Sequence, residues 1–329
     1  MLKKTVPILL LTALLAGCVS TKKGSEETLL TLEEQEIALK RTKAPQQANY
    51  GVYELQGGIA INAEPRLHPN HRVELSYLAD RAPVVAAQGK SSRAKLNVLI
   101  DPSSAASWIE FNKAQALDAY FLALDGVYVP YPDRVAVGAD AFAATVSQLR
   151  FDMFFMEDVA FFVRMAKNNL GSFARGIKDP LVHAVLGYDM LKVFEYIQFD
   201  ARGKKVVLSA TTPYTPNSGR LVGQAQILNN LLNTAVNPGL IVEGAIDGEE
   251  MPIMLDFAGD YFFRRGDVST PVTELVSMGE IAELDVPTVS GTFTDLMPRA
   301  GNRMLEKYLI TICPLKGVVY FERPTLEIE

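Results

Sequence analysis

The sequence predicts a mostly β protein whose body is built from two similar lobes. Short runs rich in Val, Ile, Tyr and Phe recur between clusters of Gly, Pro, Asn and Asp, as is typical of strands separated by turns. Two sequence signals also occur twice and in the same order, which indicates a duplicated unit. A polar segment separates this β-rich body from an apolar N-terminal stretch.

The N-terminal stretch has the pattern of an export signal. Lys3 and Lys4 precede an apolar run over residues 6–15, and small residues stand directly before Cys18. The run is too short for a stable transmembrane helix, which needs roughly 20 apolar residues. We therefore expect residues 1–17 to be a signal peptide. An ordinary signal peptide, in which Cys18 is incidental, is the alternative.

Leu15-Ala16-Gly17-Cys18 resembles the lipobox of bacterial lipoproteins. The resemblance implies cleavage before Cys18, a diacylglyceryl group on its sulfur and acylation of the new amine. Two or three acyl chains anchor a protein far more firmly than one, at about 0.8 kcal/mol per buried CH2. Val19 rather than Asp follows the lipid site, and by resemblance to enterobacterial sorting this favours the outer membrane.

The composition disfavours two classes of partner. Removing residues 1–17 takes away two lysines and no acid, so the formal charge moves from -6 to -8. This acidic balance disfavours nucleic acid and electrostatic adhesion to anionic lipid.

Once Cys18 is lipidated only Cys313 remains, so no intrachain disulfide is expected. Because Cys313 lies in an apolar segment, we expect it to be a buried hydrophobic residue.

The chain divides into four predicted segments. Residues 1–17 are the signal peptide, 18–48 a lipidated tether with one candidate helix over residues 29–39, 49–212 the N-terminal lobe and 213–329 the C-terminal lobe. Residues 211–219, rich in turn-forming residue types, are the predicted linker between the lobes. Strands are predicted at 58–63, 72–78, 96–100, 126–129, 205–209, 240–246 and 308–312, and helices at 182–194 and 302–308, whereas 221–233 fits either.

The first repeated signal is an apolar strand that ends in aspartate. Residues 96–100 lead into Asp101 and residues 251–255 lead into Asp256, at a spacing of 155. The second signal is a glycine that opens a short helix, followed by a strand and a basic turn. It occurs at Gly187 and again at Gly301, at a spacing of 114.

This arrangement resembles the aspartic peptidases of the pepsin and retropepsin-like group over roughly residues 50–325. Each lobe of that family has a strand entering Asp-Thr/Ser-Gly and, downstream, an apolar-apolar-Gly element before a helix. The resemblance implies two β-barrel lobes, a peptide-binding cleft between them, and Asp101 and Asp256 as the catalytic pair. Two such carboxylates share a proton, so one activates a water and the other assists the scissile carbonyl. No metal or cofactor is implied.

The residues after each aspartate depart from the family pattern. Pro102 and Phe257 stand where the family has Thr or Ser, and Ser103 and Ala258 replace the following Gly. Pro102 removes an N–H, and Phe257 must find an apolar site where the family places a polar lock. Ser103 and the adjacent Ser104 are candidates to replace the missing hydroxyls in the first lobe only.

Three functions stay open at this point. The motif losses favour a pseudopeptidase that binds a peptide or protein without cleaving it. The alternative is an active, divergent aspartic endopeptidase that uses Asp101 and Asp256. A second alternative is a structural envelope-assembly lipoprotein unrelated to peptidases. The simplest interpretation of both aspartates is that they cap turns at the ends of strands. His68 and His71 flank a Pro-Asn pair and are expected in a solvated loop rather than in a metal site.

Overall fold

The computed structural model describes most of the predicted body. The described residues are 30–40, 50–55, 58–63, 65–68, 72–90, 95–124, 141–164, 182–228, 239–266, 270–291 and 297–324. Within them the chain is mostly β, as predicted, and the helices are few and short. Cys18 and the predicted strand 126–129 lie outside the described residues.

The first lobe contains a closed barrel. Its sheet consists of β3 (Arg66–His68), β5 (Val84–Gly89), β6 (Lys95–Ile100), β7 (Trp108–Ile109), β8 (Tyr120–Leu124), β9 (Ala141–Phe151), β10 (Phe154–Arg164) and β11 (Ala184–Leu186). The strand order is β3-β10-β7-β11-β6-β5-β9-β8, and β10 also pairs with β9. That extra pairing closes six of the strands into a ring.

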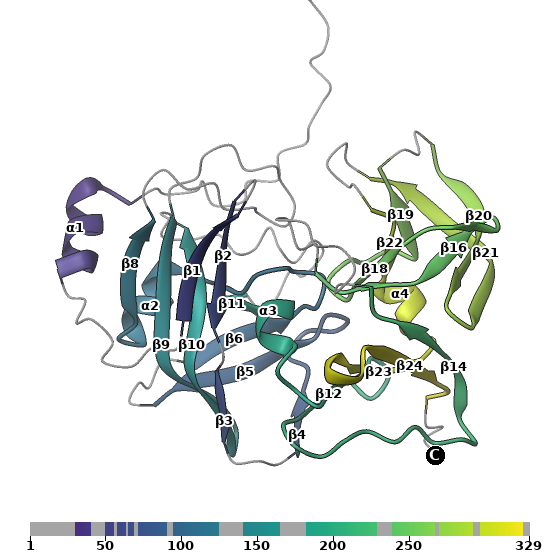
Figure 1. Ribbon diagram of the computed structural model, residues 1–329, viewed down its shortest axis with the longest axis horizontal. Coiled ribbons are helices and arrows are strands. Elements are labelled where there is room, and N and C mark those ends of the chain that lie inside the picture. The colour runs from purple at the N-terminus through teal and green to yellow at the C-terminus, as the bar shows by residue number, and fades with distance from the viewer. Residues whose placement is uncertain are drawn as a thin grey trace, which may run out of the picture.

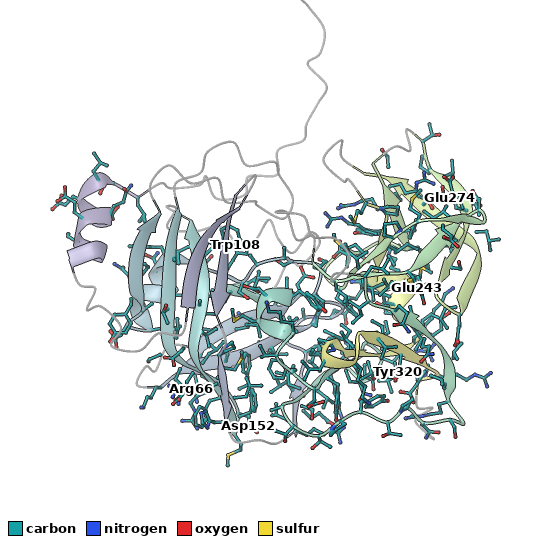
Figure 2. The ribbon with its side chains drawn as sticks, viewed as in Figure 1. Arg66, Trp108, Asp152, Glu243, Glu274 and Tyr320 are labelled. Atoms are coloured by element: carbon teal, nitrogen blue, oxygen red, sulfur yellow. The ribbon has the colours of Figure 1, made fainter. Side chains whose placement is uncertain are left out.

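Large apolar side chains fill the first lobe. Trp108, Phe151, Phe154 and Phe161 are each at most 1% exposed, and Trp108 lies among the strands of this lobe (Figure 2). Trp108 and the buried apolar side chains of β10 therefore belong to the core of this lobe.

The second lobe repeats the connectivity of the first. Its sheet consists of β15 (Ile241–Val242), β16 (Gly244–Ile246), β17 (Glu249–Glu250), β18 (Ile253–Asp256), β19 (Phe263–Arg265), β20 (Val272–Met278), β21 (Ile281–Ser290) and β22 (Arg299–Gly301). In the first lobe β6 is parallel to β11, and β11 is antiparallel to β7, which is parallel to β10. In the second lobe β18 is likewise parallel to β22, β22 is antiparallel to β19, and β19 is parallel to β21. This sheet is a half-barrel, and only Glu243 separates β15 at one end of the strand order from β16 near the other end.

A six-stranded antiparallel sheet joins the two lobes. It consists of β4 (Arg72–Ser76), β12 (Tyr196–Asp200), β13 (Lys205–Ser209), β14 (Leu221–Gln226), β23 (Leu309–Cys313) and β24 (Val318–Glu322). The order is β14-β24-β23-β12-β13-β4, so each lobe contributes three neighbouring strands. The central pair, β12 with β23, places Ile197 opposite Ile312. In Figure 1 the strands β4, β12, β23, β24 and β14 lie in the lower centre and lower right of the view, and the predicted linker 211–219 connects β13 to β14.

The helices and the remaining hairpin are peripheral or short. They are α1 (Leu32–Lys40), α2 (Phe111–Ala116), α3 (Tyr188–Leu191), α4 (Asn302–Leu305), the 3-10 turn η1 (Pro314–Lys316) and the hairpin β1 (Tyr50–Leu55) with β2 (Gly58–Ala63). The candidate helix of the tether is α1, which lies beside β8 (Figure 1). Across the described ranges, no helix combines the length and apolar character needed to cross a bilayer.

Two secondary-structure expectations need correction, and one open alternative is resolved in part. The predicted helix 182–194 is the strand β11 followed by the short helix α3, because β11 pairs in parallel with β6 far away in the sequence. The predicted helix 302–308 ends at Leu305, since β23 begins at Leu309 and pairs with β12. The ambiguous segment 221–233 is a strand over its first six residues, where it pairs with β24.

Candidate functional site

Asp101 and Asp256 occupy equivalent places in the two lobes. Asp101 directly follows β6, and its N–H donates to the carbonyl of Leu186 on the parallel strand β11 at 3.0 Å. Asp256 ends β18 and stands opposite Gly301 on the parallel strand β22. Both aspartates are buried, at 4% and 6% exposure. The structure therefore brings the two predicted site residues to the ends of matching central strands.

Equivalent backbone bonds hold the loop after each aspartate. In the first lobe the N–H of Tyr188 donates to the carbonyl of Ser104 at 2.8 Å. In the second, the N–H of Asn302 donates to the carbonyl of Gly259 at 2.9 Å. Each acceptor lies three residues after its aspartate, so the internal repeat extends to individual hydrogen bonds.

The repeated glycines allow these loops to approach the neighbouring strand. A Cβ at Gly187 would lie 2.5 Å from the carbonyl oxygen of Ala106, closer than real Cβ atoms come to other atoms. A Cβ at Gly301 would lie 2.5 Å from Cδ2 of Tyr261 and nearer still to its carbonyl oxygen. Ala106 and Tyr261 are each five residues beyond their aspartate. The glycine at a spacing of 114 is thus required by close backbone packing.

Asp101 uses only one of its two carboxyl oxygens within the described structure. Its Oδ1 accepts from the N–H of Ser103 at 3.0 Å and from the Ser103 hydroxyl at 2.7 Å. No described residue donates to Oδ2. Burial and the negative charge of Asp256 raise the pKa of Asp101 to about 7, against the opposing effects of Ser103 and of the Arg299 charge.

Asp256 is bound on both oxygens by its own lobe. Its Oδ1 accepts from the N–H groups of Ala258 at 3.1 Å and Gly259 at 2.9 Å. Its Oδ2 accepts from the hydroxyl of Tyr261. Nη1 of Arg299 lies 3.8 Å from the same Oδ2, and both side chains of this ion pair are buried. The two aspartates therefore share their position in the fold but differ in their surroundings.

Tyr261 is held in place from several sides. Its ring fills the space next to Gly259 and Gly301, where any side chain would overlap it. The guanidinium of Arg264 lies 5.0 Å above the ring centroid, a favourable cation–π distance. Burial and the charge of Asp256 raise the pKa of Tyr261 well above its ordinary value. The hydroxyl therefore stays protonated and donates to Asp256.

The residues that replace the family's polar lock pack between the lobes instead. Phe257 is 4% exposed and stacks on Phe199 of the shared sheet, so the expected apolar site exists. The N–H of Leu240 donates to the carbonyl of Pro102 at 2.7 Å, which ties the second lobe to the first aspartate loop. Pro83 matches Leu240 in strand register but has no N–H, so the reciprocal bond is absent.

The serines of the first loop stay within their own lobe. Ser103 donates to Asp101, and the Ser104 hydroxyl donates to the carbonyl of Ala106 at 2.7 Å. In the described structure neither hydroxyl reaches the second lobe, so neither reproduces a lock between the two loops.

A further buried carboxylate in the first lobe has a structural role. Asp189 accepts from the Ser107 hydroxyl at 2.7 Å, and that hydroxyl accepts from the N–H of Gly187 at 2.9 Å. Burial raises the pKa of Asp189 to about 6. This network fixes the start of α3 beneath the Asp101 loop.

Among the described residues, His68, His183 and Cys313 form no hydrogen bond or ion pair with Asp101 or Asp256. His68 lies on β3 beside Glu157 at 3.5 Å, and His183 accepts from the N–H of Asn97 at 3.1 Å. Cys313 is fully buried, as expected, and burial raises the pKa of its thiol to about 11. His71 lies outside the described residues. Across the described ranges, no group of three His, Cys, Asp or Glu side chains could hold a metal ion.

No protein-family model matches this chain, and no curated protein matches it. The site is therefore interpreted from its own residues. Tyr261 and Arg299 contact Asp256 and are the residues of this candidate site that the sequence did not predict. Arg299 offered one signal, a charged residue in the otherwise apolar approach to Gly301, at the position where the first lobe has Val185.

Proposed function

We propose that this chain is a membrane-anchored envelope lipoprotein whose aspartic-peptidase-like body binds a peptide or protein segment between its lobes without cleaving it. The proposal rests on the hydrogen bonds that Asp256 already accepts from its own lobe. Both of its oxygens accept hydrogen bonds from its own lobe, and Arg299 stands beside the second oxygen. A dyad mechanism needs both carboxylates to act on one water and one carbonyl. Because both Asp256 oxygens already accept hydrogen bonds, few of their lone pairs are left to bind that water or carbonyl.

The pepsin-like part of the proposal is supported by the repeated topology. In each lobe a central strand leads into an aspartate and a parallel strand leads into a glycine. The lobes meet in one antiparallel sheet to which each contributes three strands. The strand that leads into an aspartate and the downstream glycine, each present in both lobes, are features that the resemblance implies for a two-lobed aspartic peptidase.

The membrane part rests on the sequence before the described residues. Leu15-Ala16-Gly17-Cys18 supports lipidation of Cys18, and Val19 supports delivery to the outer membrane. Labelling of cells with a fatty acid, followed by membrane fractionation, tests both points. We expect label on the wild-type chain in the outer-membrane fraction and none on Cys18→Ser. Label that persists in Cys18→Ser would contradict this anchor.

An active aspartic endopeptidase is the second candidate function. The observation that favours it is Asp101, whose Oδ2 accepts no hydrogen bond from the described residues and whose pKa is raised towards neutrality. A carboxyl group with such a pKa is suited to proton transfer near neutral pH. In this alternative, a substrate would have to displace Tyr261 from Asp256.

One experiment separates the two functions. The full-length chain in detergent micelles is incubated with mixed peptides between about pH 3 and pH 7, beside Asp101→Asn and Asp256→Asn, and products are identified by mass spectrometry. We expect no cleavage by any of the three, together with saturable binding of selected peptides to the wild-type chain. Cleavage that both substitutions abolish would establish the endopeptidase instead. Neither cleavage nor binding would contradict both candidates.

A further inference from the structure

We propose that Tyr261 and Arg299 fix Asp256 as the ionised carboxylate of the pair, which leaves Asp101 as the group that holds the proton. The protonated Asp101 then donates a hydrogen bond to a ligand carbonyl. The statement about the ligand rests on the proposed function. The statement about the two aspartates concerns the chain alone and can be tested without any ligand.

The contacts of Asp256 favour its charged form. A carboxylate accepts hydrogen bonds on both oxygens, whereas a protonated carboxyl must use one oxygen as a donor. Here Oδ1 accepts two backbone N–H groups, from Ala258 and Gly259, and Oδ2 accepts the hydroxyl of Tyr261. The positive charge of Arg299 lies 3.8 Å from Oδ2. A proton on Oδ2 would compete with the Tyr261 hydroxyl and face the cation.

The fold is shaped to hold Tyr261 in this position. Its ring occupies space that is open only because residues 259 and 301 are glycines. Arg264, itself 6% exposed, covers the ring face. A tyrosine with a ring enclosed in this way has few alternative rotamers, so its hydroxyl stays on Asp256.

The first lobe lacks this arrangement. The residue five positions after Asp101 is Ala106, where the second lobe has Tyr261. The residue two positions before Gly187 is Val185, where the second lobe has Arg299. Neither an alanine nor a valine can donate a hydrogen bond or supply a positive charge. The asymmetry between the aspartates therefore comes from two substitutions at matching positions of the repeat.

The surroundings of Asp101 favour its protonated form. It is 4% exposed, and its Oδ2 receives no hydrogen bond from any described residue. The charged groups that act on it are Asp256, which opposes ionisation, and the more weakly acting Arg299, which Asp256 already binds. A proton on Oδ2 makes Asp101 a buried hydrogen-bond donor. The complementary ligand group is an acceptor such as the backbone carbonyl of an extended peptide.

The test is a site-resolved titration of the full-length chain in detergent micelles. Aspartate carboxyl carbons are labelled with 13C, and the two signals are assigned with Asp101→Asn and Asp256→Asn. Between about pH 5 and pH 8 we expect the Asp101 signal to titrate and the Asp256 signal to stay constant. Two signals that move together over this range in the wild-type chain would overturn the inference.

Tyr261→Phe removes the hydroxyl and keeps the ring that fills the space beside the two glycines. We expect the Asp256 signal of this variant to shift over the same pH range, because the anion has lost a donor. Tyr214→Phe is the matched control, since it removes a hydroxyl bond to a different carboxylate, that of Glu322. It is expected to leave both signals as in the wild-type chain. A constant Asp256 signal in folded Tyr261→Phe would contradict the role of the hydroxyl.

Arg299 supplies a second, independent pair of variants. Arg299→Lys keeps the positive charge and is expected to behave as the wild-type chain. Arg299→Gln removes the charge, and we expect its Asp256 carboxyl signal to shift with pH over the same range as the Asp101 signal. Equal behaviour of the two folded variants would contradict the role of the charge. None of these readouts needs a peptide, so absence of peptide binding would overturn the proposed function while leaving the charge assignment standing.

Discussion

Phe257 of the second lobe stacks on Phe199 of the first, with ring centroids 4.1 Å apart and ring planes at 20°. Phe257 directly follows Asp256, and Phe199 belongs to the central strand pair of the shared sheet. The residue next to one site aspartate therefore reaches into the other lobe through an aromatic contact. This contact couples the geometry of the site to the packing of the lobes.

Truncating this contact should destabilise the whole chain. We expect Phe257→Ala and Phe199→Ala each to lower the free energy of unfolding by about 3–5 kcal/mol, because both rings are buried. Chemical denaturation of the single and double variants measures the coupling between the rings, expected at about 0.5–1.5 kcal/mol. Additive losses would show that the rings stabilise the protein independently. Met153→Ala, at an exposed hairpin residue, is the control and should change little.

The paired glycines permit a second prediction. Gly187→Ala and Gly301→Ala each place a Cβ against a backbone carbonyl, so we expect losses of about 2–3 kcal/mol or more in the free energy of unfolding. Gly219→Ala is the matched control, because its Cβ would meet only the Asn217 side chain at an ordinary 3.4 Å. Thermal unfolding of the three variants makes the comparison. A tolerated alanine at either repeat glycine would contradict the close packing described here.

Local sequence signals predicted much of the fold. The β2 and β13 strands match the predicted segments 58–63 and 205–209 because alternating or apolar β-branched runs between turn residues are readable within a few positions. The matching positions of Asp101 and Asp256 were also predictable, since each strand and its aspartate are contiguous. Such features depend on neighbours in the chain.

Features that depend on distant partners were not predictable in the same way. The short strand β11 was expected to be helical, and its pairing with β6 and β7 makes it a strand. Tyr261 was missed because its significance arises from three neighbours, the carboxylate of Asp256 and the spaces at Gly259 and Gly301. A single tyrosine in a turn carries no such information in sequence.

Asp101 predicts a pH dependence of stability. Its pKa is raised from 3.8 to about 7 in the folded chain, so the folded state holds this proton more tightly than the unfolded state. Below about pH 4 both states are protonated and Asp101 makes no difference. As the pH rises towards 7 the folded state loses stability, by up to roughly 4 kcal/mol above that pH. Asn at this position has no proton to lose.

The corresponding measurement compares unfolding free energies at about pH 4 and pH 8. We expect Asp101→Asn to be close to the wild-type chain at the lower pH and more stable than it at the higher pH. Asp152→Asn is the control, because Asp152 is an exposed turn residue (Figure 2) whose φ of 53° is one that Asn tolerates. The unfolding free energies of this variant and of the wild-type chain should not diverge between the two pH values. An Asp101→Asn variant that is less stable than wild type at pH 8 would contradict the raised pKa.

An ion-pair cluster next to Tyr261 predicts the opposite pH dependence on a smaller scale. Asp260 accepts from Arg81 of the first lobe at 3.0 Å and from Nε of Arg303 at 2.7 Å. These bonds lower the pKa of Asp260, so its contribution is present above about pH 4 and is lost as the pH falls further. Because the Asp260 side chain is 39% exposed, solvent screening limits the effect to about 1 kcal/mol or less. We expect Asp260→Asn to lower the free energy of unfolding slightly at pH 6, and to match the wild-type chain at pH 2 or in high salt. A difference that is equally large under all three conditions would show that Asp260 acts through packing, and that this link between the lobes is not ionic.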